Sequence, residues 1–145
     1  MAVQNRVDSS TYKFVKSGNA AAKTNETIKQ DAGRAADLLA NTVVSLDPVN
    51  NKWVPFTNEA AVDGTEKPTG IVLDTVPQAS IVAGDVTGIS ILVGSACYVD
   101  QNMLVIENSK TLATVIGTLN ITVEQCLRWA GIFMEPTIDI SAFEN

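Results

Sequence analysis

The sequence contains no histidine among its 145 residues, which removes the commonest general base and the commonest zinc ligand of proteins. Without histidine a serine–histidine–aspartate triad is impossible, and a cysteine nucleophile has no imidazole to lower its pKa. The glycines form neither a dinucleotide-binding fingerprint nor a phosphate-binding loop, and the aspartates do not have the spacing of a calcium loop. We therefore predict no enzymatic activity, no cofactor and no metal site.

Cysteine is scarce, with only Cys97 and Cys126 in the chain. Cys97 lies in an apolar stretch typical of a strand, and Cys126 lies in a stretch typical of a helix. We interpret both as buried thiols that pack as small hydrophobic side chains. A disulfide between them is an open alternative, because the sequence does not give the distance between their Cα atoms.

Long apolar runs are also missing. The first residues lack the apolar core of a signal peptide, and no stretch is long enough to span a bilayer. We expect a soluble protein that has no membrane partner and is not exported by a cleaved signal.

Positive charge is scarce outside the first 37 residues. That segment has six basic and four acidic side chains, a net charge of +2, whereas the other 108 residues have four basic and twelve acidic ones, a net charge of −8. Neutralising phosphates requires clustered lysine and arginine, so we predict no nucleic-acid partner. The basic segment suits an acidic protein surface or the acidic remainder of its own chain.

The first 37 residues also differ from the rest in composition. Much of the segment is small and polar, but residues 10–16 alternate as in a strand, which places Tyr12 and Phe14 on one face. That apolar face has no obvious partner nearby in the sequence. We predict that residues 1–37 form a flexible N-terminal arm and that residues 38–145 form one globular domain.

Short strands and turn residues dominate the predicted domain. Asp47-Pro48 and Asn50-Asn51 predict a hairpin turn, because proline fixes φ and asparagine tolerates the left-handed region. Pro55 predicts that the second strand of this hairpin is short or lies at an edge. The strands are expected at residues 43–46, 53–56, 70–76, 89–99 and 132–140, with a turn at 82–88. The fold class is therefore mainly β with minor α, a small mixed β domain of the sandwich or barrel type.

Local signals add further detail to this prediction. Gly94, inside the longest strand, predicts a bulge or a bend at a barrel corner. Ser109–Leu119 has apolar residues at helical spacing, and Thr122–Gln125 fits a capping box that opens a helix through Trp129. A short helix or turn over residues 31–39 is expected to bring Leu38 and Leu39 into the core.

Two pairs of side chains are candidates for binding or chemistry. Asp47 and Asp63 resemble paired carboxylates, but both flank turns, where aspartate bonds nearby backbone N–H groups, and we interpret them as turn residues. Trp53 and Trp129 are candidates for stacking on a sugar, but we expect both to be mostly buried in a small core.

The order of these units resembles a known family. The matching stretches are Thr42–Leu46, Lys52-Trp53-Val54, Asp63-Gly64, Gly70–Leu73 and Arg128–Gly131. They resemble the head decoration proteins of lambda-like tailed bacteriophages, and the resemblance spans residues 38 to 140. This chain departs from the family pattern in a longer arm and in extra residues around 105–125.

The resemblance implies a lambda-type decoration fold and a homotrimer on the outer surface of the capsid. It implies that the major capsid protein is the partner, and that the N-terminal arm orders on the shell by pairing with capsid strands. The arm residues expected to bind the capsid are Tyr12, Phe14 and Val15. The expected location is the virion, with no catalysis required for a role in cementing the shell.

Two other classes of function are compatible with the sequence. One is an adhesive or carbohydrate-binding β module displayed on a virion, in which the two tryptophans contact the ligand. The other is a small hydrolase or carrier domain, which the lack of histidine and of an exposed attachment lysine disfavours.

Overall fold

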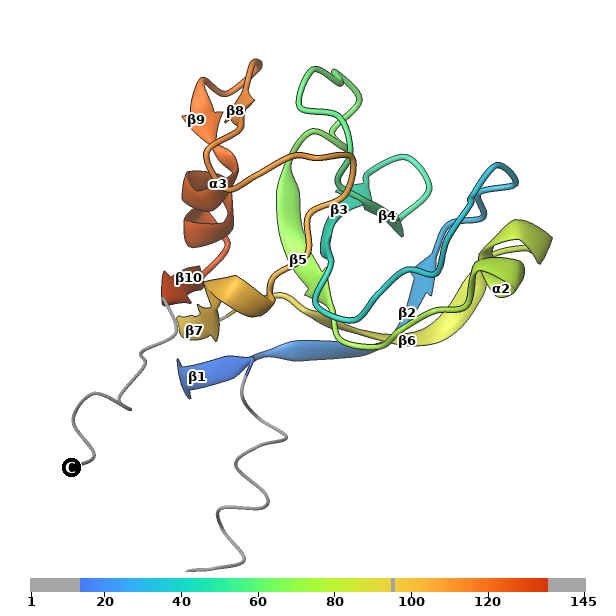
Figure 1. Ribbon diagram of the computed structural model, residues 1–145, viewed down its shortest axis with the longest axis horizontal. Coiled ribbons are helices and arrows are strands. Elements are labelled where there is room, and N and C mark those ends of the chain that lie inside the picture. Colours follow the sequence, from blue (N-terminus) through green and yellow to red (C-terminus); the bar gives the residue numbers. More distant parts are fainter. Residues whose placement is uncertain (1–13, 95, 136–145) are drawn as a thin grey trace, which may run out of the picture.

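The computed structural model describes residues 14–94 and 96–135 (Figure 1). The strands are β1 Val15–Gly18, β2 Ala22–Ile28, β3 Val43–Asp47, β4 Lys52–Pro55, β5 Pro68–Val72, β6 Val86–Leu92, β7 Cys97–Asp100, β8 Val115–Ile116, β9 Ile121–Thr122 and β10 Ile132–Glu135. The helices are α2 Gln78–Ala83, a 3-10 turn at Gln101–Met103, and α3 Val123–Trp129. The predicted fold class, mainly β with minor α, is confirmed.

Five strands close into a barrel in the order β2-β4-β3-β5-β6. All neighbours are antiparallel except β2 and β4, which pair in parallel with Ile28 opposite Trp53. One core cluster includes Ile28, Val44, Trp53, Val72, Ile81 and Ile91, with β-branched side chains that suit a strand surface. The absence of a side chain at Gly70 leaves room for the Trp53 indole, because a Cβ at this glycine would lie 2.9 Å from the ring.

The β3–β4 hairpin has the geometry that its turn residues predict. Asp47 accepts hydrogen bonds from the N–H groups of Val49 (3.0 Å) and Asn50 (3.4 Å), and Asn51 has a φ of 55°. Pro55 ends a strand of four residues, so the short strand is confirmed, but β4 has neighbours on both sides and is not an edge.

The chain leaves the barrel at Gly94, which has a φ of 75°. The predicted strand over residues 89–99 is therefore two strands, β6 in the barrel and β7 in a second, three-stranded sheet with the order β1-β7-β10. The bend expected at this glycine is confirmed. A longer continuous strand is impossible here because the left-handed φ interrupts the ladder.

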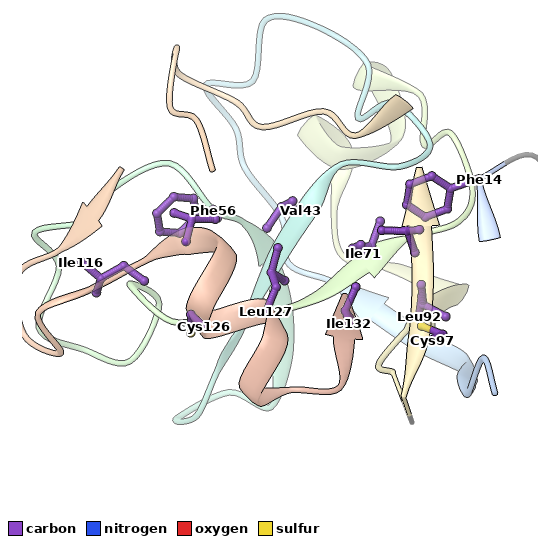
Figure 2. Packing of buried hydrophobic residues seen from close by; sticks show 12 residues of the cluster. Phe14, Val43, Phe56, Ile71, Leu92, Cys97, Ile116, Cys126, Leu127 and Ile132 are labelled. Atoms are coloured by element: carbon purple, nitrogen blue, oxygen red, sulfur yellow. The ribbon is translucent and has the colours of Figure 1, made fainter. Parts of the chain in front are cut away.

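A second core lies between the three-stranded sheet, helix α3 and the outside of β3 and β5 (Figure 2). Leu127 of α3 and Ile132 of β10 are fully buried there, beside Ile71 of the barrel. Thr122 and Gln125 form the predicted capping box, and the helix presents Val123, Cys126 and Leu127 inward.

Two local predictions are wrong. Residues 109–119 form turns and strand β8 instead of a helix, because Thr111 and Thr114 bond to nearby backbone N–H groups and compete with helical bonds. The expected turn at residues 82–88 begins inside helix α2, whose Ile81 is buried in the barrel core. Leu38 enters the core as expected, whereas Leu39 is half exposed.

The predicted boundary at residue 37 is also wrong for the described part of the segment. Residues 14–37 contain β1 and β2, and β2 closes the barrel by pairing with β6 and β4. The partner strands lie more than 20 residues later in the chain, so local sequence patterns did not reveal them. Residues 1–13 lie outside the described residues.

Candidate functional site

The predicted capsid-binding residues lie in different environments. Phe14 is only 7 % exposed and packs in the second core, beside Cys97 and Leu92 in Figure 2. Val15 opens β1 and is half-buried opposite Val99 of β7. Tyr12 lies outside the described residues. The prediction that Phe14 belongs to an unpaired apolar face is therefore corrected, because β7 and β10 supply its partners.

The pairing of β1 with β7 fixes the position at which the chain enters the domain. The N–H of Asp100 donates to the carbonyl of Phe14 (2.7 Å), and β1 pairs antiparallel with β7, with an irregularity between Val15 and Ser17. In the described sheet β1 has a neighbour on one side only, since β7 is central and β10 lies beyond it. The chain thus enters the domain through an edge strand.

The outer face of this sheet carries an aromatic pair. Tyr98 of β7 and Phe133 of β10 lie directly opposite each other, with ring centroids 5.2 Å apart and an angle of 28° between the rings. Tyr98 is 43 % exposed, so the pair forms a solvent-accessible aromatic surface beside β1. The sequence did not predict this pair, because only the pairing of β7 with β10 in the folded chain brings the two rings together.

Basic side chains of the first 37 residues bind carboxylates of the rest of the domain. The pairs are Lys16–Asp100 at 3.8 Å, Lys29–Asp47 at 3.1 Å and Arg34–Glu107, the last bidentate with Nη1 to Oε1 at 2.9 Å. The hydrogen bonds that Arg34 donates to the Glu107 carboxylate raise the pKa of Arg34 above its ordinary value. Of the two acidic surfaces that the sequence allowed, the chain's own body is the one that these residues contact.

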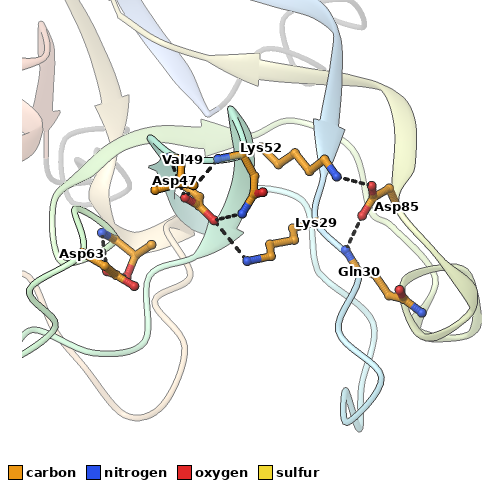
Figure 3. Close-up of polar contacts among 9 residues, drawn as sticks. Lys29, Gln30, Asp47, Val49, Lys52, Asp63 and Asp85 are labelled. Carbon is orange, nitrogen blue, oxygen red and sulfur yellow. Dashed lines mark hydrogen bonds and ion pairs between the residues drawn. The ribbon is translucent and has the colours of Figure 1, made fainter.

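Asp47 and Asp85 each accept hydrogen bonds from several described residues and form a polar group beside the β3–β4 hairpin (Figure 3). Asp47 Oδ2 accepts from Asn50 (2.8 Å) and Lys29 (3.1 Å), while Asp85 accepts from Lys52 (2.5 Å) and from the N–H of Gln30 (2.8 Å). These contacts join β2, the β3–β4 hairpin and the loop before β6. The turn role predicted for Asp47 is confirmed, and so is that of Asp63, which accepts from the N–H of Thr65 (3.0 Å).

A cavity of about 320 Å³ opens beside this group, at one end of the barrel. Its apolar lining comes from Ile28, Val54, Pro55 and Ile81, and its cationic groups are Lys29 and Arg34. Both cations are already paired with carboxylates, so the cavity offers no free positive charge to an anion. Over residues 14–94 and 96–135, acidic and cysteine side chains form no cluster that suits a metal ion.

The polar group around Asp47 predicts a pH dependence of stability. Hydrogen bonds from Asn50 and Lys29 hold the pKa of Asp47 well below its ordinary value of 3.8. The folded state therefore gains stability from ionised Asp47 above about pH 4 and loses that gain as the pH falls. We expect Asp47→Asn to be less stable than the wild type at pH 7, with a difference that shrinks between pH 5 and pH 2 in urea unfolding.

A second substitution checks the cause of this pH dependence. Lys29→Gln removes one donor to Asp47 and keeps the aspartate, so it should show a smaller form of the same change. A destabilisation by Asp47→Asn that is equal at pH 7 and pH 2.5 would contradict the assignment and point to the lost turn geometry alone.

The cysteines behave as the sequence suggested. Both Cys97 and Cys126 are buried, and no disulfide joins them, which decides the alternative that the sequence left open. Burial raises the pKa of the Cys126 thiol above its ordinary value, which makes it a poor nucleophile.

The two tryptophans differ. Trp53 is buried, and its Nε1–H donates to Glu26 (3.0 Å). Trp129 is 71 % exposed, which corrects the expectation that both are buried. It is the last residue of α3 and lines a surface groove together with Cys126, one turn earlier on the helix.

These observations define the class of protein: a small, mainly β domain with a closed five-stranded barrel, a second sheet and internally paired charges. Neither a scan against protein-family models nor a search of curated proteins finds a match for the chain. No helix within the described residues is long and apolar enough to cross a membrane.

Proposed function

We propose that the protein is a phage head decoration protein that binds the outside of the capsid and stabilises the expanded shell by bridging capsomers. Its partner is the major capsid protein, it acts as a homotrimer without catalysis, and its place is the outer surface of the virion. The resemblance to lambda-type decoration proteins in residues 38–140 led to this proposal.

The observation that carries the proposal is the position of β1. The chain passes from residues 1–13 directly into an edge strand of the β1-β7-β10 sheet. An exposed strand edge accepts a strand of another protein through main-chain hydrogen bonds, and a segment that continues such a strand is suited to pair with a foreign sheet. We place the capsid contact in residues 1–13, including Tyr12, with Phe14 and Val15 as the first residues anchored in the domain.

The remainder of the domain suits a mechanical role. Ion pairs that join segments distant in the sequence, such as Arg34–Glu107 and Lys52–Asp85, tie the loops to the barrel. A rigid body that carries one short contact segment per copy gains avidity when three copies are joined, because each bound segment raises the local concentration of the others. Bridging capsomers in this way resists outward pressure.

Deletion of residues 1–13 tests the proposal. We expect the shortened protein to keep the unfolding midpoint of the full chain, since Phe14 and β1 are retained, and to lose at least about tenfold in affinity for expanded phage heads. Binding is measured by co-sedimentation with heads, and folding by circular dichroism. Thr24→Ala, at an exposed position of β2 outside every proposed contact, serves as the control that should bind as the wild type does. Unchanged binding of the shortened protein would refute the assignment.

A second candidate is a virion-displayed carbohydrate-binding module, and the exposed Trp129 is the observation that favours it. The lining beside this indole offers only Lys67 and Thr69 as polar side chains, fewer than a sugar ring with several hydroxyls requires. A glycan screen of the wild type and Trp129→Ala separates the two functions: saturable sugar binding that is lost in the variant would favour the module.

A further inference from the structure

A shallow groove runs beside the exposed Trp129. Its volume is about 340 Å³, and its lining residues are Lys67, Thr69, Leu119, Cys126, Trp129 and Ala130. These come from the start of β5, the β8–β9 turn and the end of α3. The groove is therefore mainly apolar, with one large aromatic side chain on the surface of the protein, the composition typical of the centre of a protein interface.

The positive charge that residues 38–135 leave available lies near this groove. From residue 38 on there are four basic side chains. Lys52 and Lys110 form ion pairs with Asp85 (2.5 Å) and Glu59 (2.8 Å). Arg128 contacts only its exposed helix neighbour Glu124 at 3.7 Å, and Lys67 forms no ion pair with any described residue. Of the four basic side chains from residue 38 on, the two available to a partner are thus Lys67, which lines the groove, and Arg128, which precedes Trp129, in a segment whose net charge is −8.

A surface of complementary character exists on the same molecule. Val49 and Val62 are the most exposed large apolar side chains of the described residues, each 85 % exposed. The loops that carry them lie side by side, because a Cβ at Gly64 would lie 2.9 Å from the ring of Pro48. The exposed Asp63 follows Val62 and adds a carboxylate to this tip (Figure 3). We name Val49, Val62 and Asp63 the valine tip.

We propose that the valine tip of one copy binds the Trp129 groove of a second copy of this chain. The valines cover the indole and Leu119, and Asp63 lies against Lys67. Such a contact is heterologous, since different surfaces meet, and it closes a ring when successive copies are related by a suitable rotation. The tip and the groove are close on one molecule, because the N–H of Lys67 bonds to the carbonyl of Gly64 (3.3 Å). Neighbouring patches of this kind suit a small ring.

This inference deepens the proposed function, since a ring of this kind is the trimer that gives the capsid contact its avidity. It is tested without any capsid. The full-length protein is studied by sedimentation velocity over a range of concentrations. We expect self-association in the wild type, a dissociation constant raised at least about tenfold by Trp129→Ala, and a comparable loss with Val62→Asp. Both positions are exposed, so folding is checked by an unchanged unfolding midpoint.

Mixing the two variants provides the decisive measurement. Trp129→Ala keeps an intact tip, and Val62→Asp keeps an intact groove, so a 1:1 mixture has one productive contact and should form a heterodimer while each variant alone stays monomeric. A symmetric contact that uses the same surface on both copies would not recover in this way. Absence of the heterodimer, or a wild type that is monomeric at all concentrations, would overturn the proposal.

Charge variants add an independent check. Lys67→Glu should weaken association several-fold and reduce its salt dependence, while Lys23→Glu, the same charge change at an exposed position of β2, should leave it unchanged. Equal effects of the two variants would mean that only net charge matters, and would refute the role of Lys67.

If the groove variants abolish self-association but single copies still bind phage heads through residues 1–13, the capsid proposal stands. If self-association follows these expectations but heads are not bound, the capsid proposal fails and the ring stands.

Discussion

Replacing Phe14 by alanine is expected to lower the free energy of unfolding by about 3–5 kcal/mol, the range for removing a buried phenylalanine. The ring is almost fully covered in the second core, near Ile71, Leu92 and Cys97 (Figure 2). Its loss leaves a cavity between the three-stranded sheet and the barrel. Urea unfolding of the isolated protein, followed by tryptophan fluorescence, measures the change.

The control for this substitution is Val49→Ala, at an 85 % exposed position, which should change the free energy of unfolding by no more than about 0.5 kcal/mol. The outcome discriminates between two interpretations of the N-terminal segment. If Phe14 belonged to an arm that binds only the capsid, its removal would leave the isolated protein as stable as the control and would weaken capsid binding alone. A loss below about 1 kcal/mol would favour that arm.

The parts of the fold that the sequence predicted are those set by neighbouring residues. The β3–β4 hairpin follows from Asp47 and Asn51, because both side-chain bonding and a positive φ are local properties. Helix α3 follows from the reciprocal bonds of Thr122 and Gln125. In each case the residues that determine the element lie within a few positions of one another.

The failures concern partners distant in the sequence. Phe14 and β1 looked unpaired because their partner β7 begins at Cys97, about 80 residues later. The neighbours of β2 in the barrel also lie far along the chain, β4 beginning at Lys52 and β6 at Val86, so the segment was assigned to an arm although it closes the barrel. Small polar residues suit a solvent-facing edge as well as an arm, and composition alone does not distinguish the two.

The candidate contact surfaces were predicted less well than the fold. Trp129 was expected in the core because large apolar residues usually are, but it is the last residue of α3, where Cys126 and Leu127 already fill the inward side. The groove beside it also needs Lys67, just before β5, which only the folded chain brings near α3. Counting charges along the sequence did identify the excess of carboxylates in residues 38–145. Because cations are scarce in that segment, a lysine that forms no ion pair there is a candidate contact for a partner.

Gly94→Ala is the second substitution with a large expected effect, and Gly88→Ala is its matched control. Both glycines have a φ of 75°, so alanine meets the same backbone strain at each, about 1–2 kcal/mol. They differ in the space available. At Gly88 nothing lies within 4 Å of an added Cβ, whereas at Gly94 the carbonyl oxygen of Ala130 and Cγ1 of Ile132 both lie 2.7 Å away.

The clash at Gly94 involves backbone that cannot move without disturbing the junction of α3 and β10. The N–H of Ala96 bonds to the carbonyl of Gly131 (3.0 Å) at this point, so a shift there would also weaken the contact between β7 and β10. We expect Gly94→Ala to lose about 1–3 kcal/mol more than Gly88→Ala in urea unfolding, as overpacked sites do. Equal losses in the two variants would mean that the bend from the barrel into β7 has room to relax. Glycine would then be required at position 94 only for its positive φ.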